Sequence, residues 1–329
     1  MIKRWLGCLS RQTLQSRYLP GSCVIFTFHR VLSEEEYKIT RFQRSIAVSD
    51  GALRLFLIAI KQRFNIISVQ QLIDHQKSDG GTLDAKLSYA CITFDDGWRD
   101  NYTNAFPILK ELNVPATIFL STAYIDSTSG FWWQQLGDIL LNETLSDAQR
   151  AGLTALLSRY LEPSLANSLD ADGIIDTIKR EHYSDAQVIT DQAVSIAKSG
   201  ASRHCLSWSQ CQEMSAYNIS FGSHSINHPR LSLLSKADQE NELVTSKLEI
   251  SQKRISYVNG FCYPYGDFNQ SVVGLAKQNY DIGLTTNTGV CRLDFDSTML
   301  LPRINVDQAL ALDSDRLSYR LMRAALRRT

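Results

Sequence analysis

The chain has 329 residues, 44% of them hydrophobic, which is enough to bury the core of one large domain or of two small ones. Lys and Arg together number 34, as do Asp and Glu, so the formal net charge is zero. This balance provides no positive surface for wrapping nucleic acid, and we expect no nucleic-acid partner.

The cysteines and the first residues bear on the cellular compartment. The seven cysteines include no CxxC pair, and several lie in apolar runs typical of buried strands, which favours reduced thiols over a disulfide framework. Residues 1–21 are partly basic but lack the continuous apolar stretch of a signal peptide or a membrane-spanning helix. We therefore expect a cytoplasmic protein.

Short apolar runs that end in polar, Gly or Pro residues predict buried strands. In chain order these runs are Val24–Phe28, Ala90–Phe94, Ala116–Leu120, Ile219–Phe221 and Gly260–Tyr263, with weaker candidates at Ile282–Thr285 and Leu300–Ile304. Segments with helical periodicity lie between some of them, for example at residues 53–64 and 243–250. The alternation predicts an α/β fold with a largely parallel sheet, and about seven strands favour a (β/α) barrel over an open sheet.

Residues from about 130 to 202 interrupt this alternation, because they carry helix formers and no clear strand. We expect a helical insertion there, within a main domain that spans residues 21–310. Residues 1–20 form a basic amphipathic segment, and residues 311–329 are expected to form a basic C-terminal helix. Packing of these ends on the body is the preferred interpretation, and docking on the anionic inner face of a membrane is the alternative.

Two adjacent carboxylates, Asp95 and Asp96, come directly after the second predicted strand and are followed by Gly97, which permits a tight turn. In a parallel barrel, residues at the carboxyl ends of strands face the active site. Asp and Gly are also common turn residues, so an ordinary turn is the alternative when this motif stands alone.

A second motif follows the strand predicted at Ile219–Phe221, where His224 and His228 are four residues apart. On a helical turn this spacing places both imidazoles on one side, close enough to share a cation. An exposed helix face is the alternative. The HExxH motif of zinc proteases does not fit, because Ser225 stands where its Glu would be.

Together, one of the two carboxylates and these two imidazoles would form a three-ligand site for a divalent metal with open coordination positions, which is the catalytic and not the structural pattern. Such a metal lowers the pKa of bound water from about 15.7 to about 7 and polarises a carbonyl group. Hydrolysis of an amide needs both effects.

The motifs around Asp95 and His224 resemble the first and second motifs of the polysaccharide deacetylases, the NodB-homology family of carbohydrate esterases. The resemblance implies a distorted barrel in which Asp95 is the catalytic base and Asp96, His224 and His228 hold a metal, commonly zinc. It extends over most of the chain, and the further matching segments are Phe28–Val31, Asn104–Leu109, Pro115–Phe119, Phe261–Gly266 and Leu301–Ile304.

The segment Tyr263–Gly266 resembles the third motif of the family, which implies that the backbone N–H of Tyr265 helps to stabilise the oxyanion. The sequence departs from the family here, because the Arg that usually precedes the Pro-Tyr pair and contacts the base is replaced near Cys262. Arg303 is a candidate to supply the missing charge, with an ordinary structural ion pair as the alternative.

The sequence departs from the family a second time at the motif that supplies the general acid. The late Leu-x-x-x-His motif of the commonest members is absent, since His228 is the last histidine of the chain. The arrangement is similar to the circularly permuted subgroup that acts on poly-N-acetylglucosamine, in which the acid is an early His, and His29 at the end of the first strand fits. A buried structural histidine is the alternative.

Substrate contacts are expected from Trp98, Pro264 and Arg303. A flat aromatic face suits the C–H groups of a sugar ring, although core packing is the alternative for Trp98 and also for Trp132 and Trp133.

The sequence thus predicts a metal-dependent hydrolase that removes N-acetyl groups from amino sugars of a polysaccharide or a lipid-linked glycan. Sugar O-deacetylation or deformylation by the same site is one alternative. A non-catalytic glycan-binding protein of the same fold is another, although such a protein would have no reason to retain a complete set of base, metal ligands and acid.

Overall fold

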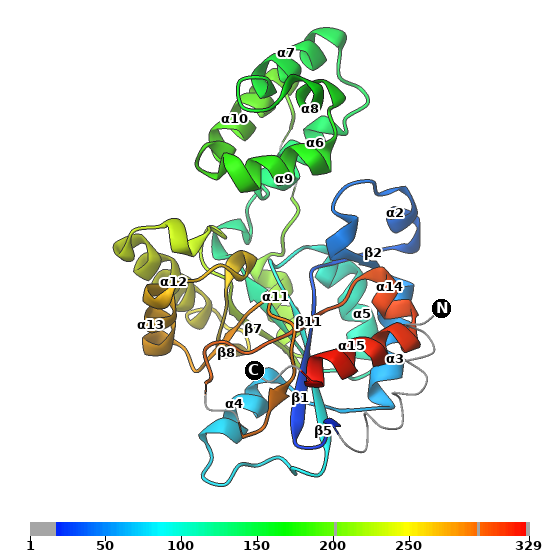
Figure 1. Cartoon of the computed structure of the whole chain (residues 1–329), viewed down its shortest axis with the longest axis vertical. Coiled ribbons are helices and arrows are strands. Elements are labelled where there is room, and N and C mark those ends of the chain that lie inside the picture. Colours follow the sequence, from blue (N-terminus) through cyan, green and yellow to red (C-terminus); the bar gives the residue numbers. More distant parts are fainter. Residues whose placement is uncertain (1–17, 201–202, 295–296, 327–329) are drawn as a thin grey trace. The chain divides into compact units, whose positions relative to one another are not determined.

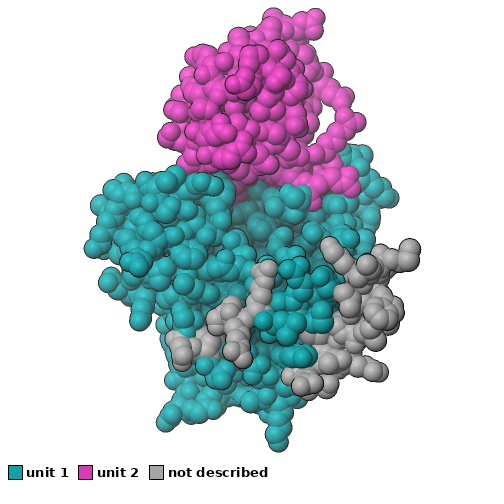
Figure 2. Space-filling model, in the orientation of Figure 1, with its two compact units in different colours: residues 1–39, 45–126, 205–329 teal, residues 40–44, 127–204 magenta. Residues whose placement is uncertain are grey.

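The computed structural model describes residues 18–200, 203–294 and 297–326. The chain divides into two compact units, which Figure 2 shows in different colours. Unit 1 comprises residues 1–39, 45–126 and 205–329, and unit 2 comprises residues 40–44 and 127–204. The predicted amphipathic segment 1–20 falls almost wholly outside the described residues.

Unit 1 is built around a large, mostly parallel sheet (Figure 1). Along the sheet the strands follow the order β10, β1, β5, β6, β7, β8 and β9, with β11 paired to β1 and β4 paired to β5. In chain order the strands are β1 (Ser22–Phe28), β4 (Asn65–Ile66), β5 (Ser88–Phe94), β6 (Ala116–Leu120), β7 (Ile219–Ser223), β8 (Tyr257–Cys262), β9 (Ile282–Leu284), β10 (Cys291–Arg292) and β11 (Ile304–Asn305). A small second sheet pairs β2 (Arg30–Leu32) with β3 (Ala47–Ser49).

The sheet is curled, as predicted for a distorted α/β barrel. Leu284 at the end of β9 forms a parallel bridge to Leu301, and the following strand β11 pairs in parallel with β1. These two contacts connect the β9 side of the sheet back to β1. The strand predicted at Leu300–Ile304 is therefore only partly correct, because Pro302 has no N–H to donate and regular pairing begins at Ile304.

The helices of unit 1 flank this sheet (Figure 1). They are α2 (Glu34–Ile39), α3 (Asp50–Lys61), α4 (Val69–Lys77), α5 (Phe106–Glu111), α11 (Trp208–Ser215), α12 (Lys236–Ser251), α13 (Gln270–Asn279), α14 (Gln308–Leu312) and α15 (Ser314–Leu326). Ser49, Ser68, Ser207 and Ser235 cap α3, α4, α11 and α12 by accepting a backbone N–H of the first turn.

The core of unit 1 explains why the sequences of the strands are continuous apolar runs. Every residue of β1 is buried, and Phe26 and Phe28 both contact the ring of Phe56 on α3 edge to face. Phe28 also stacks on Phe94 of β5. In a parallel sheet both faces of the strands are covered, so both sets of side chains are buried. The strand sequences are therefore continuously apolar and do not alternate with polar residues.

In the described part of unit 2, all regular elements are helices. They are α6 (Trp132–Leu140), α7 (Asp147–Leu157), α8 (Pro163–Ser168), α9 (Ala171–Glu181) and α10 (Ala186–Ala197). Apolar residues of these helices make its core, since Leu153, Leu157, Ile174 and Ile178 are each 0% exposed.

The C-terminal helix α15 packs its apolar side on the body, because Leu317, Leu321 and Ala324 are 2%, 2% and 1% exposed. These side chains are not available to enter a membrane, and the arginines of the helix are exposed. Among the described residues, no helix has the length and apolarity needed to cross a bilayer. The six cysteines in the described part of the chain are buried and form no disulfide.

Candidate active site

The candidate site lies at the carboxyl ends of the parallel strands of unit 1. His29 follows β1, Asp95 and Asp96 follow β5, and His224 follows β7. Carboxyl ends of parallel strands gather at one side of a barrel, so residues that are far apart in sequence meet there. Gly97 completes the turn after β5 with φ of +78°, and a Cβ at this position would lie 2.9 Å from Leu120 Cδ2.

The register of β1 and β5 brings His29 to Asp95. Phe28 pairs with Phe94, and the backbone N–H of Asp95 donates to the Phe28 carbonyl at 3.0 Å. The residues that directly follow this pair are then neighbours, and His29 Nε2 lies 3.9 Å from Asp95 Oδ2. The side chain of His29 is 23% exposed and that of Asp95 only 3%. The imidazole is therefore the group of the two that an approaching substrate meets first.

Arg303 holds the Asp95 carboxylate in a bidentate ion pair. Its Nη1 donates to Oδ1 at 2.8 Å and its Nη2 to Oδ2 at 2.7 Å. Burial raises the pKa of Asp95, but the charge and hydrogen bonds of Arg303 outweigh this effect and lower the pKa to about 2. Arg303 is 1% exposed, which corrects its expected contact with substrate. Arg303 is therefore the charge partner of Asp95, the predicted base.

Asp96, His224 and His228 form a compact cluster of possible metal ligands. Asp96 Oδ1 lies 3.4 Å from His224 Nε2 and 3.3 Å from His228 Nε2. In a tetrahedral site with ligand atoms about 2.1 Å from zinc, neighbouring ligand atoms are about 3.4 Å apart. Asp96 Oδ1 is buried and receives no hydrogen bond from the described residues. The donor set therefore fits a divalent cation.

Hydrogen bonding orients the His224 ring for such a role. His224 Nδ1 lies 2.7 Å from the carbonyl oxygen of Cys262. Because a carbonyl can only accept, Nδ1 carries the proton and leaves the lone pair of the neutral ring on Nε2, which faces Asp96. A backbone carbonyl behind a metal-binding histidine is the usual way in which proteins select this tautomer.

The two histidines come together on an irregular loop, and the prediction of a helical turn is wrong. His228 has φ of +54°, a left-handed conformation that a helix does not contain. The carboxylate of Glu242 on α12 organises this loop, since it accepts the backbone N–H groups of Ile226 and Asn227 at 2.8 and 2.9 Å. The imidazole centroids are 4.8 Å apart.

A second group of possible ligands, Asp95, His224 and Cys262, overlaps the first. It is less suited to a cation, because Arg303 already occupies it and its Nη2 lies 3.0 Å from Cys262 Sγ. Burial raises the pKa of the Cys262 thiol, and a protonated thiol is a poor metal ligand. The cluster built on Asp96 is therefore the better cation site of the two.

Tyr265 lies in a short turn at Pro264–Gly266, directly after β8, and has φ of +58°. Its ring centroid is 4.5 Å from that of His228, so the third motif lies beside the candidate metal ligands. Pro264 is buried in the same turn. The oxyanion role of the Tyr265 N–H and the substrate contact of Pro264 remain predictions.

Trp98 is fully buried, which corrects its expected stacking on a sugar. Its Nε1–H donates to Asp96 Oδ2 at 2.8 Å, so one oxygen of the carboxylate is fixed while the other faces the histidines. Trp132 and Trp133 are 6% and 3% exposed within unit 2, in agreement with core packing there.

Two groups around the site had no signal in the sequence. Glu242 lies in the middle of a charged helical stretch, and the Cys262 carbonyl is a backbone group. The role of Trp98 had a weak signal, because an indole two residues after Asp96 can reach back to it, but an aromatic residue beside a glycan-type motif favoured stacking instead.

Comparison with known proteins places this geometry in a family. The model of the polysaccharide deacetylase family matches residues 83–282, which is more than half of the chain. The chain belongs to the polysaccharide deacetylase family. It is 24% identical over 233 residues to YxkH of Bacillus subtilis (strain 168), whose name refers to polysaccharide deacetylation. This alignment covers 70% of the chain but 56% of YxkH, so the chain spans little more than half the length of this curated relative.

Several solved structures, among them two deacetylases, share the fold. The deacetylase PplD of Streptococcus pyogenes, solved in complex with acetate, superposes with a TM-score of 0.57 at 20% identity, over 94% of this chain and all of PplD (100%). The deacetylase domain of BpsB from Bordetella bronchiseptica superposes with a TM-score of 0.54 at 19% identity, over 88% and 97% of the two chains. IcaB from Ammonifex degensii gives 0.54 at 17% identity, over 91% and 97%.

Removal of a metal ligand from this family member should release the metal. Asp96→Ala, His224→Ala and His228→Ala are each expected to bind well below one equivalent of divalent metal, because a three-ligand site loses one donor. Metal analysis after dialysis measures this. His204→Ala in unit 2 and Cys262→Ser are matched controls expected to keep the metal. A full equivalent in all three ligand variants would refute the site, and loss in Cys262→Ser with retention in His228→Ala would move it to the overlapping group.

The hydrogen bond from Trp98 should contribute to metal affinity. Trp98→Phe keeps an aromatic ring but removes the donor to Asp96, and loss of such an outer partner typically weakens metal binding by roughly 10- to 100-fold. Competition with a chelator of known affinity measures the change, with Trp208→Phe as the control on α11. Equal affinity in the two variants would show that Trp98 only fills space.

Proposed function

We propose that the protein is a metal-dependent hydrolase that removes N-acetyl groups from amino sugars of a polysaccharide or glycan precursor. The observation that carries the proposal is the meeting of four groups at one end of the barrel: a three-ligand cluster, an Arg-paired carboxylate, a partly exposed imidazole and the turn that holds Tyr265. Family membership and the deacetylase structures of the same fold support it.

Asp96, His224 and His228 would hold the cation, for which zinc suits two imidazoles and a carboxylate. When bound, such a cation supplies an acidified water and polarises the acetyl carbonyl. The residues of the chain supply the proton transfers and the orientation of the reacting groups.

Asp95 would accept the proton of the attacking water. Its pKa of about 2 keeps it ionised at neutral pH, and Arg303 holds its position. The water oxygen forms a bond to the acetyl carbon, and the Tyr265 backbone N–H donates to the oxygen that becomes negatively charged.

His29 would then donate a proton to the sugar nitrogen as the C–N bond breaks. An amine is a poor leaving group unless protonated, and an imidazole is a suitable donor near neutral pH. The products are acetate and a free amino sugar, so water and the acetamide are consumed in equal amounts.

Mass spectrometry of candidate glycans incubated with the metal-loaded protein tests the proposal. N-acetylated, O-acetylated and N-formylated sugars are compared, and loss of the N-acetyl mass is expected. Loss confined to the O-acetyl or N-formyl sugar would change the reaction assigned to the same site. Binding of the glycans without any product would indicate a non-catalytic glycan-binding protein and refute the proposal.

A further inference from the structure

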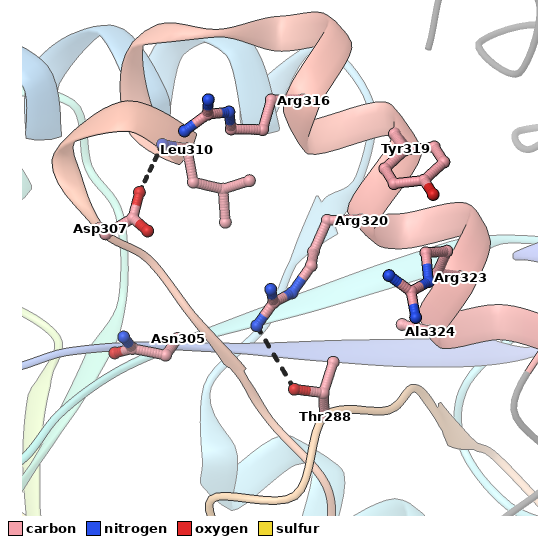
Figure 3. A pocket seen from close by; sticks show the side chains of 9 residues that line it. All are labelled: Thr288, Asn305, Asp307, Leu310, Arg316, Tyr319, Arg320, Arg323 and Ala324. Carbon is pink, nitrogen blue, oxygen red and sulfur yellow. Dashed lines mark hydrogen bonds between the residues drawn. The ribbon is translucent and has the colours of Figure 1, made fainter. Parts of the chain in front are cut away.

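A pocket of about 510 Å³ lies between the C-terminal helix α15 and the loops beside β9 and β11. Figure 3 shows Arg316, Arg320 and Arg323 on its helix side, with Arg320 reaching toward Thr288. Asn305, at the end of β11, lines the opposite side. Its volume is within the range of about 300–1,000 Å³ that is usual for small-molecule sites.

The arginines share one face of α15 because they are spaced at i, i+4 and i+7. All three are exposed, and no carboxylate of the described residues forms an ion pair with them. The acidic residue of the pocket, Asp307, already uses Oδ1 to cap α14 through the Leu310 N–H at 2.7 Å. Among the described residues, the pocket therefore has an excess of positive charge.

One wall of the pocket lies at the catalytic end of the barrel. Thr288 follows β9, and Asn305 ends β11, where it pairs in parallel with Thr27. Thr27 is two residues before His29 on β1, and Arg303 is two residues before Asn305. Because parallel strands direct their carboxyl ends to one side, Asn305 lies on the side of the sheet where His29 and Asp95 lie.

We propose that this pocket binds a phosphate group carried by the glycan substrate. This inference rests on the proposed function and names the class of its substrate. Guanidinium groups only donate hydrogen bonds and match the geometry of phosphate oxygens, whereas a neutral sugar would leave the excess of positive charge unmatched. The hydroxyl groups of Thr288 and Tyr319 and the amide of Asn305 supply neutral polar groups for the sugar that carries the phosphate.

Calorimetry with glucose 1-phosphate and glucose tests the pocket without deacetylation, because neither sugar has an acetyl group. The phosphorylated sugar is expected to bind to the full-length protein and glucose is not. Arg320→Gln should weaken binding by roughly tenfold, the loss of one charge-assisted contact. Arg254→Gln is the matched control, since Arg254 is exposed and lies before β8, at the other end of the sheet.

Two further measurements identify the source of the phosphate. A phosphorylated N-acetyl glycan should have a lower KM than the unphosphorylated form, and Arg320→Gln should remove this difference. Vesicles of phosphatidylglycerol should bind equally to the wild type and to Arg320→Gln.

The proposal is overturned if glucose 1-phosphate does not bind, or if Arg320→Gln binds it as the wild type does. Vesicle binding that depends on Arg320, without binding of glucose 1-phosphate, would assign the pocket to lipid head groups and also overturn it. Binding that depends on Arg320 in a protein that deacetylates no glycan would refute the proposed function while retaining the phosphate site.

Discussion

Asp95→Asn is expected to lower kcat by roughly 100- to 10,000-fold, the usual contribution of a general base, while the metal stays bound. The amide has nearly the shape of the carboxylate but cannot accept the proton of the attacking water. Asp95 is not part of the Asp96 cluster, so the ligands of the cation remain unchanged.

The same substitution should also destabilise the fold, which has to be separated from its effect on catalysis. Arg303 would keep a buried charge without its counter-charge, and breaking one side of a buried ion pair costs about 3–5 kcal/mol. Measurements at a temperature where circular dichroism shows the variant to be folded, with metal content determined in parallel, isolate the catalytic loss. An unchanged kcat in folded, metal-replete protein would remove Asp95 from the role of base.

The ion pair between Arg303 and Asp95 shows which parts of the site can be predicted from sequence alone. The carboxylate could be predicted, because a polar pair after a buried parallel strand must lie at the end of the barrel. The arginine could only be suggested, since its position in sequence, 208 residues from Asp95, says nothing of where its guanidinium points. The pairing depends on β11 lying beside β1, which no local pattern encodes.

For the loop that carries His224 and His228, the sequence predicted the correct neighbours but the wrong backbone conformation. The spacing correctly indicated that the imidazoles meet, but the assumed helical turn is absent. Glu242 fixes the loop from α12, and the His228 N–H, in a left-handed residue, donates to Ser225 Oγ at 3.0 Å. Such conformations are costly and persist where surrounding contacts enforce them, so a rule based on helical periodicity could not anticipate them.

His29→Ala is expected to lower kcat on an N-acetyl substrate by roughly 100- to 10,000-fold, with the metal and the fold retained. The resemblance to the permuted subgroup implies an early histidine as the acid, and of the four histidines outside the metal cluster only His29 ends a predicted strand. The structure adds a geometric reason: Nε2 is 3.9 Å from Asp95 Oδ2, and the side chain is partly open to solvent. The catalytic role itself is still a prediction.

The decisive measurement compares two leaving groups in the same variant. An amine must be protonated to leave, whereas the phenolate of an activated aryl acetate leaves without a proton, so His29→Ala should slow the second substrate much less. His29→Gln, which retains hydrogen bonding but cannot act as an acid at neutral pH, should behave like the alanine variant. His75→Ala removes a buried imidazole whose Nδ1 accepts the Thr82 N–H at 2.8 Å, and it should leave the ratio of the two rates unchanged. Equal slowing of both substrates by His29→Ala would mean that the imidazole positions the substrate or the base, and the proton donor would then have to be sought elsewhere.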